Sequence, residues 1–271
     1  MLRLMTFNIL VDKPGSPFPW PERRGLVAAA IEAEDPDILC IQEALEHQRT
    51  YLEDALPGYA AFGVGRNDGG QAGEQTAIFH KTAALRKLKQ GVFWLSETPT
   101  VAGSIGWDAK RPRTVTWKLL EAGDGGRFYV LNTHFDHRGL DANVHSARVI
   151  ADWRASQQDA HPVLLCGDFN SPPEGSQAFD ALLDCGFSDA YGTAGEQYLY
   201  TYHKFQVEAY SDPALRAEIL ADHPRVFRRI DHVFVSGALS ISSIRTQGAD
   251  DKGQYPSDHF PVMCDFELGH R

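Results

Sequence analysis

The stretch that decides the fold of this chain is residues 163–173, which read Val-Leu-Leu-Cys-Gly-Asp-Phe-Asn-Ser-Pro-Pro. Four apolar residues that are followed by Gly and then by Pro-Pro predict a short strand that is buried on both faces. If the backbone stays extended beyond this strand, the side chains of Asp168 and Asn170 point to the same side. The alternative is a strand followed by an Asx-type turn, which would explain Asp168 without a functional site.

The composition is that of one globular domain. The chain has 271 residues, of which 43% are hydrophobic and 23% are charged, as is usual for globular proteins. It contains no Ser/Gly-rich or Pro-rich linker and no internal repeat. We therefore expect a single domain over residues 1–271, and we expect it to be a monomer without an obligate protein partner.

The net charge makes duplex DNA a poor candidate for the substrate. Acidic residues number 36 against 26 basic ones, which gives a net charge of −10. Proteins that bind duplex DNA usually carry a basic excess on the binding face. A local basic patch or bound cations could compensate, so the charge lowers the expectation of a nucleic-acid substrate without excluding it.

Cysteine usage and the N-terminal sequence indicate a soluble, cytoplasmic protein. The chain begins directly with a strand pattern, without a basic segment followed by an apolar stretch, and no segment is long enough to span a membrane. The four cysteines are widely separated, show no metal-binding spacing, and are expected to be reduced core residues. They are Cys40, Cys166, Cys185 and Cys264.

Strand patterns outnumber helical ones and occur in both hairpin and crossover arrangements, which predicts an α/β protein with mixed sheets covered by helices. We expect strands at residues 2–10, 37–43, 76–80, 91–94, 114–120, 128–134, 163–166 and 229–235, with a last strand that ends at residue 266. Helical spacing predicts helices at residues 22–33, 46–56, 141–158, 175–185 and 213–221.

Three local features add to this outline. A strand, a helix and a second strand within the first 45 residues indicate a crossover unit. Asp141 is expected to cap the helix that it begins, and Gly186 is expected to end the helix before it. Residues 191–229 are polar, rich in Tyr and hard to interpret, and they form either a loop that covers the substrate or a surface insertion.

Polar side chains recur where the predicted strands end. Carboxylates and an amide without clustered thiols suit a hard cation such as Mg²⁺ or Mn²⁺, and imidazoles add a capacity for proton transfer. This set favours hydrolysis of a phosphate ester over acyl transfer, because the chain has no GxSxG or Cys-His signature. The residues are Asn8, Glu43, His134, Asp168, Asn170, Asp231, Asp258 and His259.

The motifs that contain these residues resemble, in order, those of the endonuclease/exonuclease/phosphatase superfamily, over residues 4–266. The resemblance implies a four-layer α/β sandwich, with two mixed β-sheets packed face to face, flanked by helices, and with the site at one rim. The motifs are Thr-Phe-Asn at 6–8, Ile-Gln-Glu at 41–43, Asn-Thr-His at 132–134, Gly-Asp-Phe-Asn at 167–170, Arg-Ile-Asp-His at 229–232 and Ser-Asp-His at 257–259.

The resemblance also implies a metal site and a residue that acts on water. Glu43 resembles the principal Mg²⁺ ligand of the superfamily, with Asn8 and Asp258 beside it, and Mn²⁺ is an alternative to Mg²⁺. Asp168 resembles the residue that orients or deprotonates the attacking water.

The remaining catalytic roles concern the phosphate. Asn170 and His134 resemble the groups that donate to the phosphate and to its developing charge. Asp231 would hold His259, and the paired carboxylate should favour the imidazolium form. The sequence leaves open whether His259 acts as a base or as a charge stabiliser.

Other residues bear on the branch of the superfamily. The abasic-site endonucleases typically place a Tyr where this chain has His134, and segments 96–99, 106–108 and 133–139 look like a compact bacterial group near the deadenylase and nocturnin-like enzymes. Residues 106–113 and segment 133–139 supply candidate substrate contacts, although a salt-bridged surface loop is the alternative. These candidates are Asp108, Arg111, Arg113 and Arg138.

The sequence thus favours an Mg²⁺- or Mn²⁺-dependent phosphoesterase that cleaves a phosphodiester or a phosphomonoester in a small or single-stranded phosphorylated substrate. One alternative is a DNA endonuclease or exonuclease of the abasic-site repair type, against which the net charge counts. Another is a binding module without catalytic activity. A degenerate copy of that kind would be expected to lack at least one of Glu43, Asp168, Asn170 and His259, and all four are present.

Overall fold

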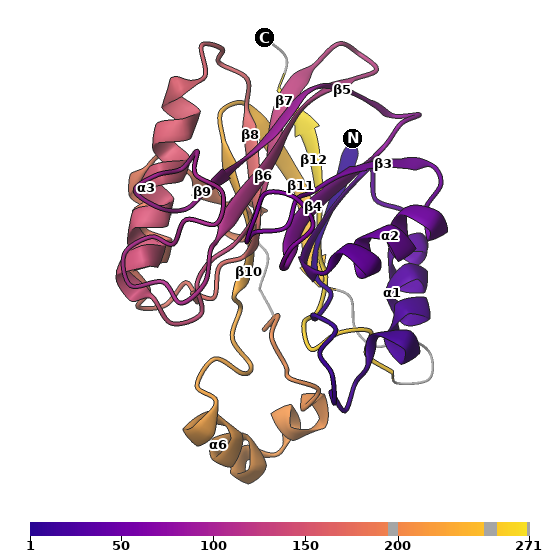
Figure 1. Cartoon of the computed structure of the whole chain (residues 1–271), viewed down its shortest axis with the longest axis vertical. Coiled ribbons are helices and arrows are strands. Elements are labelled where there is room, and N and C mark those ends of the chain that lie inside the picture. The colour runs from indigo at the N-terminus through magenta and orange to yellow at the C-terminus, as the bar shows by residue number, and fades with distance from the viewer. Residues whose placement is uncertain (195–199, 247–253, 270–271) are drawn as a thin grey trace.

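The computed structural model describes residues 1–194, 200–246 and 254–269. Two six-stranded mixed sheets pack face to face and carry helices on their outer faces, so the predicted four-layer α/β sandwich is confirmed (Figure 1). The first sheet has the order β11 (Leu239–Thr246), β12 (Val262–Leu268), β1 (Leu2–Asn8), β2 (Ile38–Ala44), β4 (Gln75–Lys81) and β3 (Tyr59–Phe62). The second has the order β5 (Leu85–Trp94), β6 (Thr114–Ala122), β7 (Arg127–His134), β8 (Val163–Asp168), β10 (Asp231–Ser236) and β9 (Ser188–Asp189).

Helices cover the outer face of each sheet. The helices α1 (Trp20–Glu34) and α2 (Glu46–Ala55) pack on the first sheet, and α3 (Leu140–Ser156) and α4 (Gln177–Asp184) pack on the second (Figure 1). A short helix, α5 (Ala190–Ala194), follows β9. Within the described parts of the chain, none of the helices is long and apolar enough to cross a membrane.

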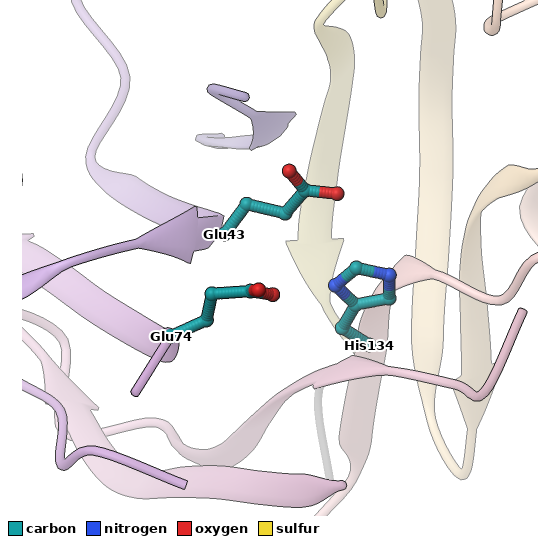
Figure 2. A group of neighbouring side chains, drawn as sticks. All are labelled: Glu43, Glu74 and His134. Atoms are coloured by element: carbon teal, nitrogen blue, oxygen red, sulfur yellow. The ribbon is translucent and has the colours of Figure 1, made fainter. Parts of the chain in front are cut away.

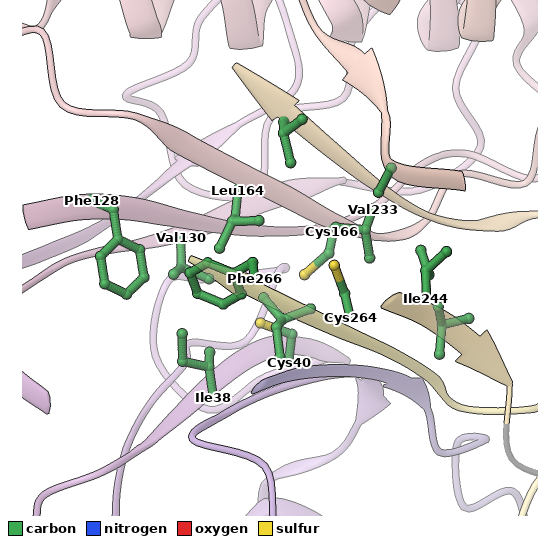
Figure 3. Packing of buried hydrophobic residues seen from close by; sticks show 14 of the residues in the cluster. Ile38, Cys40, Phe128, Val130, Leu164, Cys166, Val233, Ile244, Cys264 and Phe266 are labelled. Carbon is green, nitrogen blue, oxygen red and sulfur yellow. The ribbon is translucent and has the colours of Figure 1, made fainter. Parts of the chain in front are cut away.

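The strand that decides the fold is buried on both faces, as the sequence predicts. Leu164 and Cys166 point between the two sheets, while Val163 and Leu165 point toward the helices of the outer layer. In the space between the sheets, Leu164 and Cys166 pack with residues of the other sheet such as Phe266 (Figure 3). Because every side chain of this apolar run is removed from water, the run stabilises two layers at once.

Both sheets contain a parallel pair that is joined through a helix. The strands β1 and β2 are parallel and are connected by α1, and β7 and β8 are parallel and are connected by α3. The crossover predicted for the first 45 residues is therefore confirmed. Because parallel strands point their carboxyl ends to the same edge, these two units bring Asn8, Glu43, His134 and Asp168 to one rim.

Other predictions need correction. The edge strands β3, β9 and β11 were not expected, and β5 begins at Leu85 and not at residue 91. The helix α3 begins after Gly139, with Asp141 in its first turn, so the prediction that Asp141 is the cap is wrong. The backbone N–H of Ala142 instead donates to Asp108 Oδ1 at 2.8 Å, which satisfies one of the free amides of this helix end.

The backbone does not stay extended after β8. Asn170 has φ +51°, and its backbone N–H donates to Asp168 Oδ1 at 2.8 Å, which is the Asx-type turn considered as the alternative. The prediction that an extended backbone directs Asp168 and Asn170 to the same side is therefore wrong. The turn and a functional site are compatible here, because only one oxygen of Asp168 takes part in the turn.

Residues 200–229, called the excursion below, project beyond the ends of the strands (Figure 1). They contain a 3₁₀ helix, η1 (Val207–Ser211), and α6 (Pro213–Asp222), the second of which confirms the helix predicted for residues 213–221. A small core of Ala209, Val226 and Phe227 holds the excursion together. It is thus a compact unit with its own apolar contacts.

The cysteines are free thiols, as expected. Three of them, Cys40, Cys166 and Cys264, lie in the core between the sheets (Figure 3). The fourth, Cys185, is half-buried at the C-terminal end of α4.

Gly167 provides a test of how tightly β7 and β8 approach each other. Its φ is +140°, and a Cβ at this position would lie 1.9 Å from the carbonyl oxygen of Thr133. We expect Gly167→Ala to lower the free energy of unfolding by about 3 kcal/mol, measured by urea denaturation. Gly25→Ala is the control, since a Cβ there meets nothing within 4 Å and the helix interior favours Ala. Equal effects of the two substitutions would contradict this packing.

Candidate active site

A polar cleft of about 620 Å³ opens at the rim where the two sheets and the excursion meet. It is lined by residues that follow β1 and β2, by the ends of β7 and β8, by the start of the turn before β12, and by two side chains of the excursion. Among its lining residues are six of the eight strand-end residues that the sequence analysis singled out: Glu43, His134, Asp168, Asn170, Asp258 and His259.

Glu43 is turned into the cleft by an irregularity of its strand. The pairing of β2 with β4 shifts register between Ile41 and Ala44, and Glu43 has φ +63°, which is unusual for a residue with a side chain. Its Oε2 accepts from Val11 N at 2.9 Å and its Oε1 from Asn8 Nδ2 at 3.2 Å. Burial would raise the pKa of Glu43, but the hydrogen bond from Val11, the charge of His259 and the hydrogen bond from Asn8 hold that pKa below its usual value, so Glu43 is ionised.

Asp168 is the point on which the other side chains converge. Its Oδ1 is held by the backbone N–H of Asn170, while its Oδ2 accepts from Asn8 Nδ2 at 3.0 Å. The same Oδ2 lies 3.4 Å from His134 Nε2 and 3.9 Å from His259 Nε2. One carboxylate oxygen therefore faces an amide and two imidazoles.

A second carboxylate lies directly across from the first. Asp231 begins β10 and is paired in register with Asp168 on β8. Its Oδ2 contacts His259 Nδ1 at 2.8 Å, which is the contact that the resemblance implies, and its backbone N–H donates to Thr201 Oγ1 of the excursion. Two carboxylates on neighbouring strands thus share one imidazole.

This arrangement fixes the charges. Burial and the neighbouring Asp231 raise the pKa of Asp168 to about 7. Burial alone would lower the pKa of His259, but Asp231 and then Asp168 outweigh it and raise that pKa to about 10. At neutral pH, His259 is therefore an imidazolium, and Asp168 is able to gain or lose a proton.

His134 has the opposite character and lies beside a carboxylate that the sequence analysis missed. Burial, and then the positive charges of Arg113 and Arg66, lower the pKa of His134 well below its usual value, so the ring is neutral. Its ring points toward Glu43 and Glu74, and the ligand atoms of these three residues lie within 4.8 Å of one another (Figure 2). Glu74 follows the glycine-rich segment and directly precedes β4. Its position next to a strand end was the one feature of the sequence that could have marked it as a site residue.

The donor set fits a divalent cation. Burial, and then the charge of Glu43, raise the pKa of Glu74, so the two carboxylates repel each other, and a cation between them would relieve that repulsion. Arg66 donates to both oxygens of Glu74, at 2.7 and 2.9 Å. Asp258 lines the same cleft. Asn8 faces the carboxylates with its amide nitrogen, while its oxygen accepts from Leu10 N, so in this arrangement it orients the ligands.

The four candidate substrate contacts separate into two pairs. Arg111 and Arg113 line the cleft, and Arg113 is buried beside Asp136 at 3.3 Å. Asp108 and Arg138 are not among the residues that line it: Asp108 is bonded to the first turn of α3, and Arg138 is exposed. For these two residues the structure supports the alternative of a surface loop.

The sequence analysis did not single out three further cations that line the cleft. Arg66 pairs with Glu74, and the other two are Lys13 and Arg225. The described residues place no carboxylate within ion-pair distance of either of them, and the same holds for Arg111. Lys13 lies in the loop after β1 and Arg225 in the excursion, two segments without a pattern that would mark them. The cleft therefore combines a cluster of carboxylates with cations whose charge is not balanced by an ion pair.

A fold and a site of this kind define a hydrolase of phosphate esters, and comparison with known proteins agrees. The model of the Endonuclease/Exonuclease/phosphatase family matches residues 5–259, and the chain belongs to this family. Its members are hydrolases that cleave phosphate ester bonds as nucleases or phosphatases, and they generally depend on divalent metals. The protein is accordingly an enzyme of this class.

Several relatives are similar over nearly the whole chain. A family member from Bacteroides vulgatus is 33% identical with a TM-score of 0.87, and the match covers 98% of each chain. A mannosyl-6-phosphatase from Bacteroides thetaiotaomicron is 31% identical with a TM-score of 0.85, over 99% of this chain and 100% of the other. Nocturnin from Drosophila melanogaster is 25% identical over 98% of this chain. The match covers 47% of that relative, so this chain spans about half of its length.

The charge of His259 can be tested directly. In protein kept free of metal by a chelator, we expect the ring of His259 to titrate near pH 10 and Asp231→Asn to lower that pKa, because a carboxylate partner is lost. Because the native pKa exceeds the ordinary 6.5, this pair stabilises the fold fully below about pH 6.5, and the contribution is lost as the pH rises through about 10. NMR titration of the imidazole measures the pKa of His259 in both proteins. An unchanged pKa in the variant would show that Asp231 does not set the charge.

Proposed function

We propose that this protein is an Mg²⁺-dependent phosphoesterase, with Mn²⁺ as an alternative metal, that cleaves a small phosphorylated substrate by attack of water. The observation that carries the proposal is the composition of the cleft. Within about 620 Å³ it contains carboxylates suited to a divalent cation and two cations without an ion-pair partner among the described residues, Lys13 and Arg111, suited to a phosphate. This local positive charge stands against a net charge of −10 for the whole chain.

The size of the cleft and the relatives both favour a small substrate. Sites for small molecules commonly enclose about 300–1,000 Å³, and this cleft falls within that range. The relative named as a mannosyl-6-phosphatase is 31% identical over nearly the whole chain, so a sugar phosphate is the first compound to test. A single-stranded nucleic acid end is the second, because its phosphate presents the same chemistry.

Glu43 is the principal residue proposed to hold the cation, with Asp258 and Glu74 within the same cleft and Asn8 orienting the ligands. When bound, such a cation polarises a phosphoryl oxygen and neutralises part of its charge. His134 supplies a neutral nitrogen that faces both Glu43 and Glu74 (Figure 2).

Asp168 is the proposed acceptor of the proton from the attacking water. Its pKa, raised to about 7 by burial and by Asp231, matches that of a general base that works near neutral pH. The turn N–H of Asn170 fixes one of its oxygens, which leaves the other directed to the cleft. The carboxylate is therefore held in one orientation before the substrate binds.

The charge that develops on the phosphate is proposed to be met by three donors. His259 is cationic at neutral pH and is fixed by Asp231, so its role is that of a charge stabiliser and not of a base. His134 and Asn170 contribute neutral N–H groups. Preorganised donors of this kind cost little reorganisation when the charge appears.

The two alternatives are less well supported. A nuclease of the abasic-site type would bind a long polyanion, which the net charge of −10 disfavours. A binding module without activity is at odds with a site in which Glu43, Asp168, Asn170 and His259 are all present around one cleft.

Hydrolysis assays test the proposal. Purified protein would be assayed against mannose 6-phosphate, a chromogenic phosphodiester, a single-stranded oligonucleotide and abasic duplex DNA. We expect turnover that requires Mg²⁺ or Mn²⁺, that a chelator abolishes, and that falls about 10²–10³-fold in kcat in His259→Gln. His145→Gln is the matched control, since His145 stacks on Trp107 in the loop beside α3 and is not among the residues that line the cleft. Activity that survives the chelator and His259→Gln would refute the assigned roles, and preferred cleavage of abasic duplex would favour the nuclease.

A further inference from the structure

Arg225 connects the excursion to the centre of the site. It lies three residues after the end of α6, and its side chain lines the cleft. A single nitrogen of its guanidinium, Nη1, donates to Asn170 Oδ1 at 2.9 Å and to the carbonyl oxygen of His137 at 2.8 Å. The excursion therefore makes a direct hydrogen bond to one of the groups proposed to bind the phosphate.

Asn170 is held at both ends of its amide. Its Oδ1 accepts from Arg225, and its Nδ2 donates to the carbonyl oxygen of Phe135 at 3.1 Å. A guanidinium can only donate and a carbonyl can only accept, so these two partners together select one of the two orientations of the amide. The Nδ2 group carries a second N–H, which remains available to a ligand in the cleft.

The orientation of the Asn170 amide matters because a rotated amide would present its oxygen, and not its NH₂ group, to the phosphate. If the side chain turned by half a revolution about its last bond, oxygen would replace the NH₂ group on the side of Phe135. A lone pair would then face the anionic phosphate, and attraction would become repulsion. The backbone of Asn170 cannot correct this, since its φ of +51° and its N–H bond to Asp168 already fix the turn.

We propose that Arg225 is a positioning residue, which acts through Asn170 by holding the oxygen of its amide so that the NH₂ group is directed to the phosphate of the substrate. The proposal rests on the proposed function, in which Asn170 donates to that phosphate. Arg225 has a fixed base for this task, because the two residues that follow it, Val226 and Phe227, are buried in the core of the excursion. The backbone N–H of Phe227 also donates to the carbonyl oxygen of Tyr202 at 2.8 Å.

The kinetic test separates positioning from substrate binding. We expect Arg225→Met to lower kcat about 10- to 100-fold, as for a hydrogen bond to a charged group, with KM changed by less than about threefold. Arg225→Lys keeps a donor and should recover part of the loss. Arg228→Met is the matched control, since Arg228 lies in the same excursion, is exposed and has a carboxylate, Glu174, only at 3.9 Å. A raised KM with unchanged kcat would instead make Arg225 a substrate contact and would overturn the proposal.

A double-mutant cycle shows whether the effect passes through Asn170. In an Asn170→Ala background, Arg225→Met should cost no more than about twofold in kcat, because the group that it positions is gone. Full additivity of the two substitutions would overturn the proposal. Thermal unfolding of each variant identifies one that fails to fold, and Arg225→Lys then takes its place in the cycle.

A measurement that does not need activity keeps this proposal distinct from the proposed function. The two side-chain N–H signals of Asn170, assigned in NMR spectra by their loss in Asn170→Ala, should shift and exchange faster with solvent in Arg225→Met and stay unchanged in Arg228→Met. If the wild-type protein cleaves no phosphate ester but these signals respond, the proposed function fails and the hydrogen-bond restraint stands. Unchanged signals in Arg225→Met would overturn the proposal.

Discussion

The site depends on two buried carboxylates that lie opposite each other on paired strands and on the single imidazolium between them. Asp168 and Asp231 are in register on β8 and β10, where like charges repel and burial makes ionisation costly. His259 offsets both costs because it contacts Asp231 and approaches Asp168. It comes from the turn before β12, a strand of the other sheet, so the interaction that balances the charges also joins the two sheets at their rim.

The fold was largely accessible from the sequence because burial leaves a strong pattern. The run before Gly167 is apolar at every position, since one set of side chains packs between the sheets and the other under the helices. The edges left no such pattern: β3 is four residues long, and β11 alternates serines with apolar residues at the margin of its sheet. Short and half-exposed strands bury too little apolar surface to shape the sequence strongly.

The candidate site was only partly accessible, for a related reason. Residues on strand ends are brought together by topology, so motifs at strand ends predict neighbours in space. Glu74 and Arg225 belong to a glycine-rich loop and to the excursion, whose paths no periodicity reveals. Asp108 and Arg138 are of residue types that could contact a substrate, but neither lines the cleft. Asp108 instead accepts a hydrogen bond from the first turn of α3. Two non-glycine residues with positive φ, Glu43 and Asn170, mark where the chain accepts backbone strain to aim a functional group.

The excursion has a consequence for how a protein of this architecture can diversify. Its apolar core is its own, and its links to the catalytic rim come from two places, the short stretch 201–204 and Arg225. The sheets that carry the carboxylates do not depend on it for their packing. A lineage could therefore exchange or reshape this segment while it keeps the reaction, and only the residues at the few points of attachment would be constrained to change together.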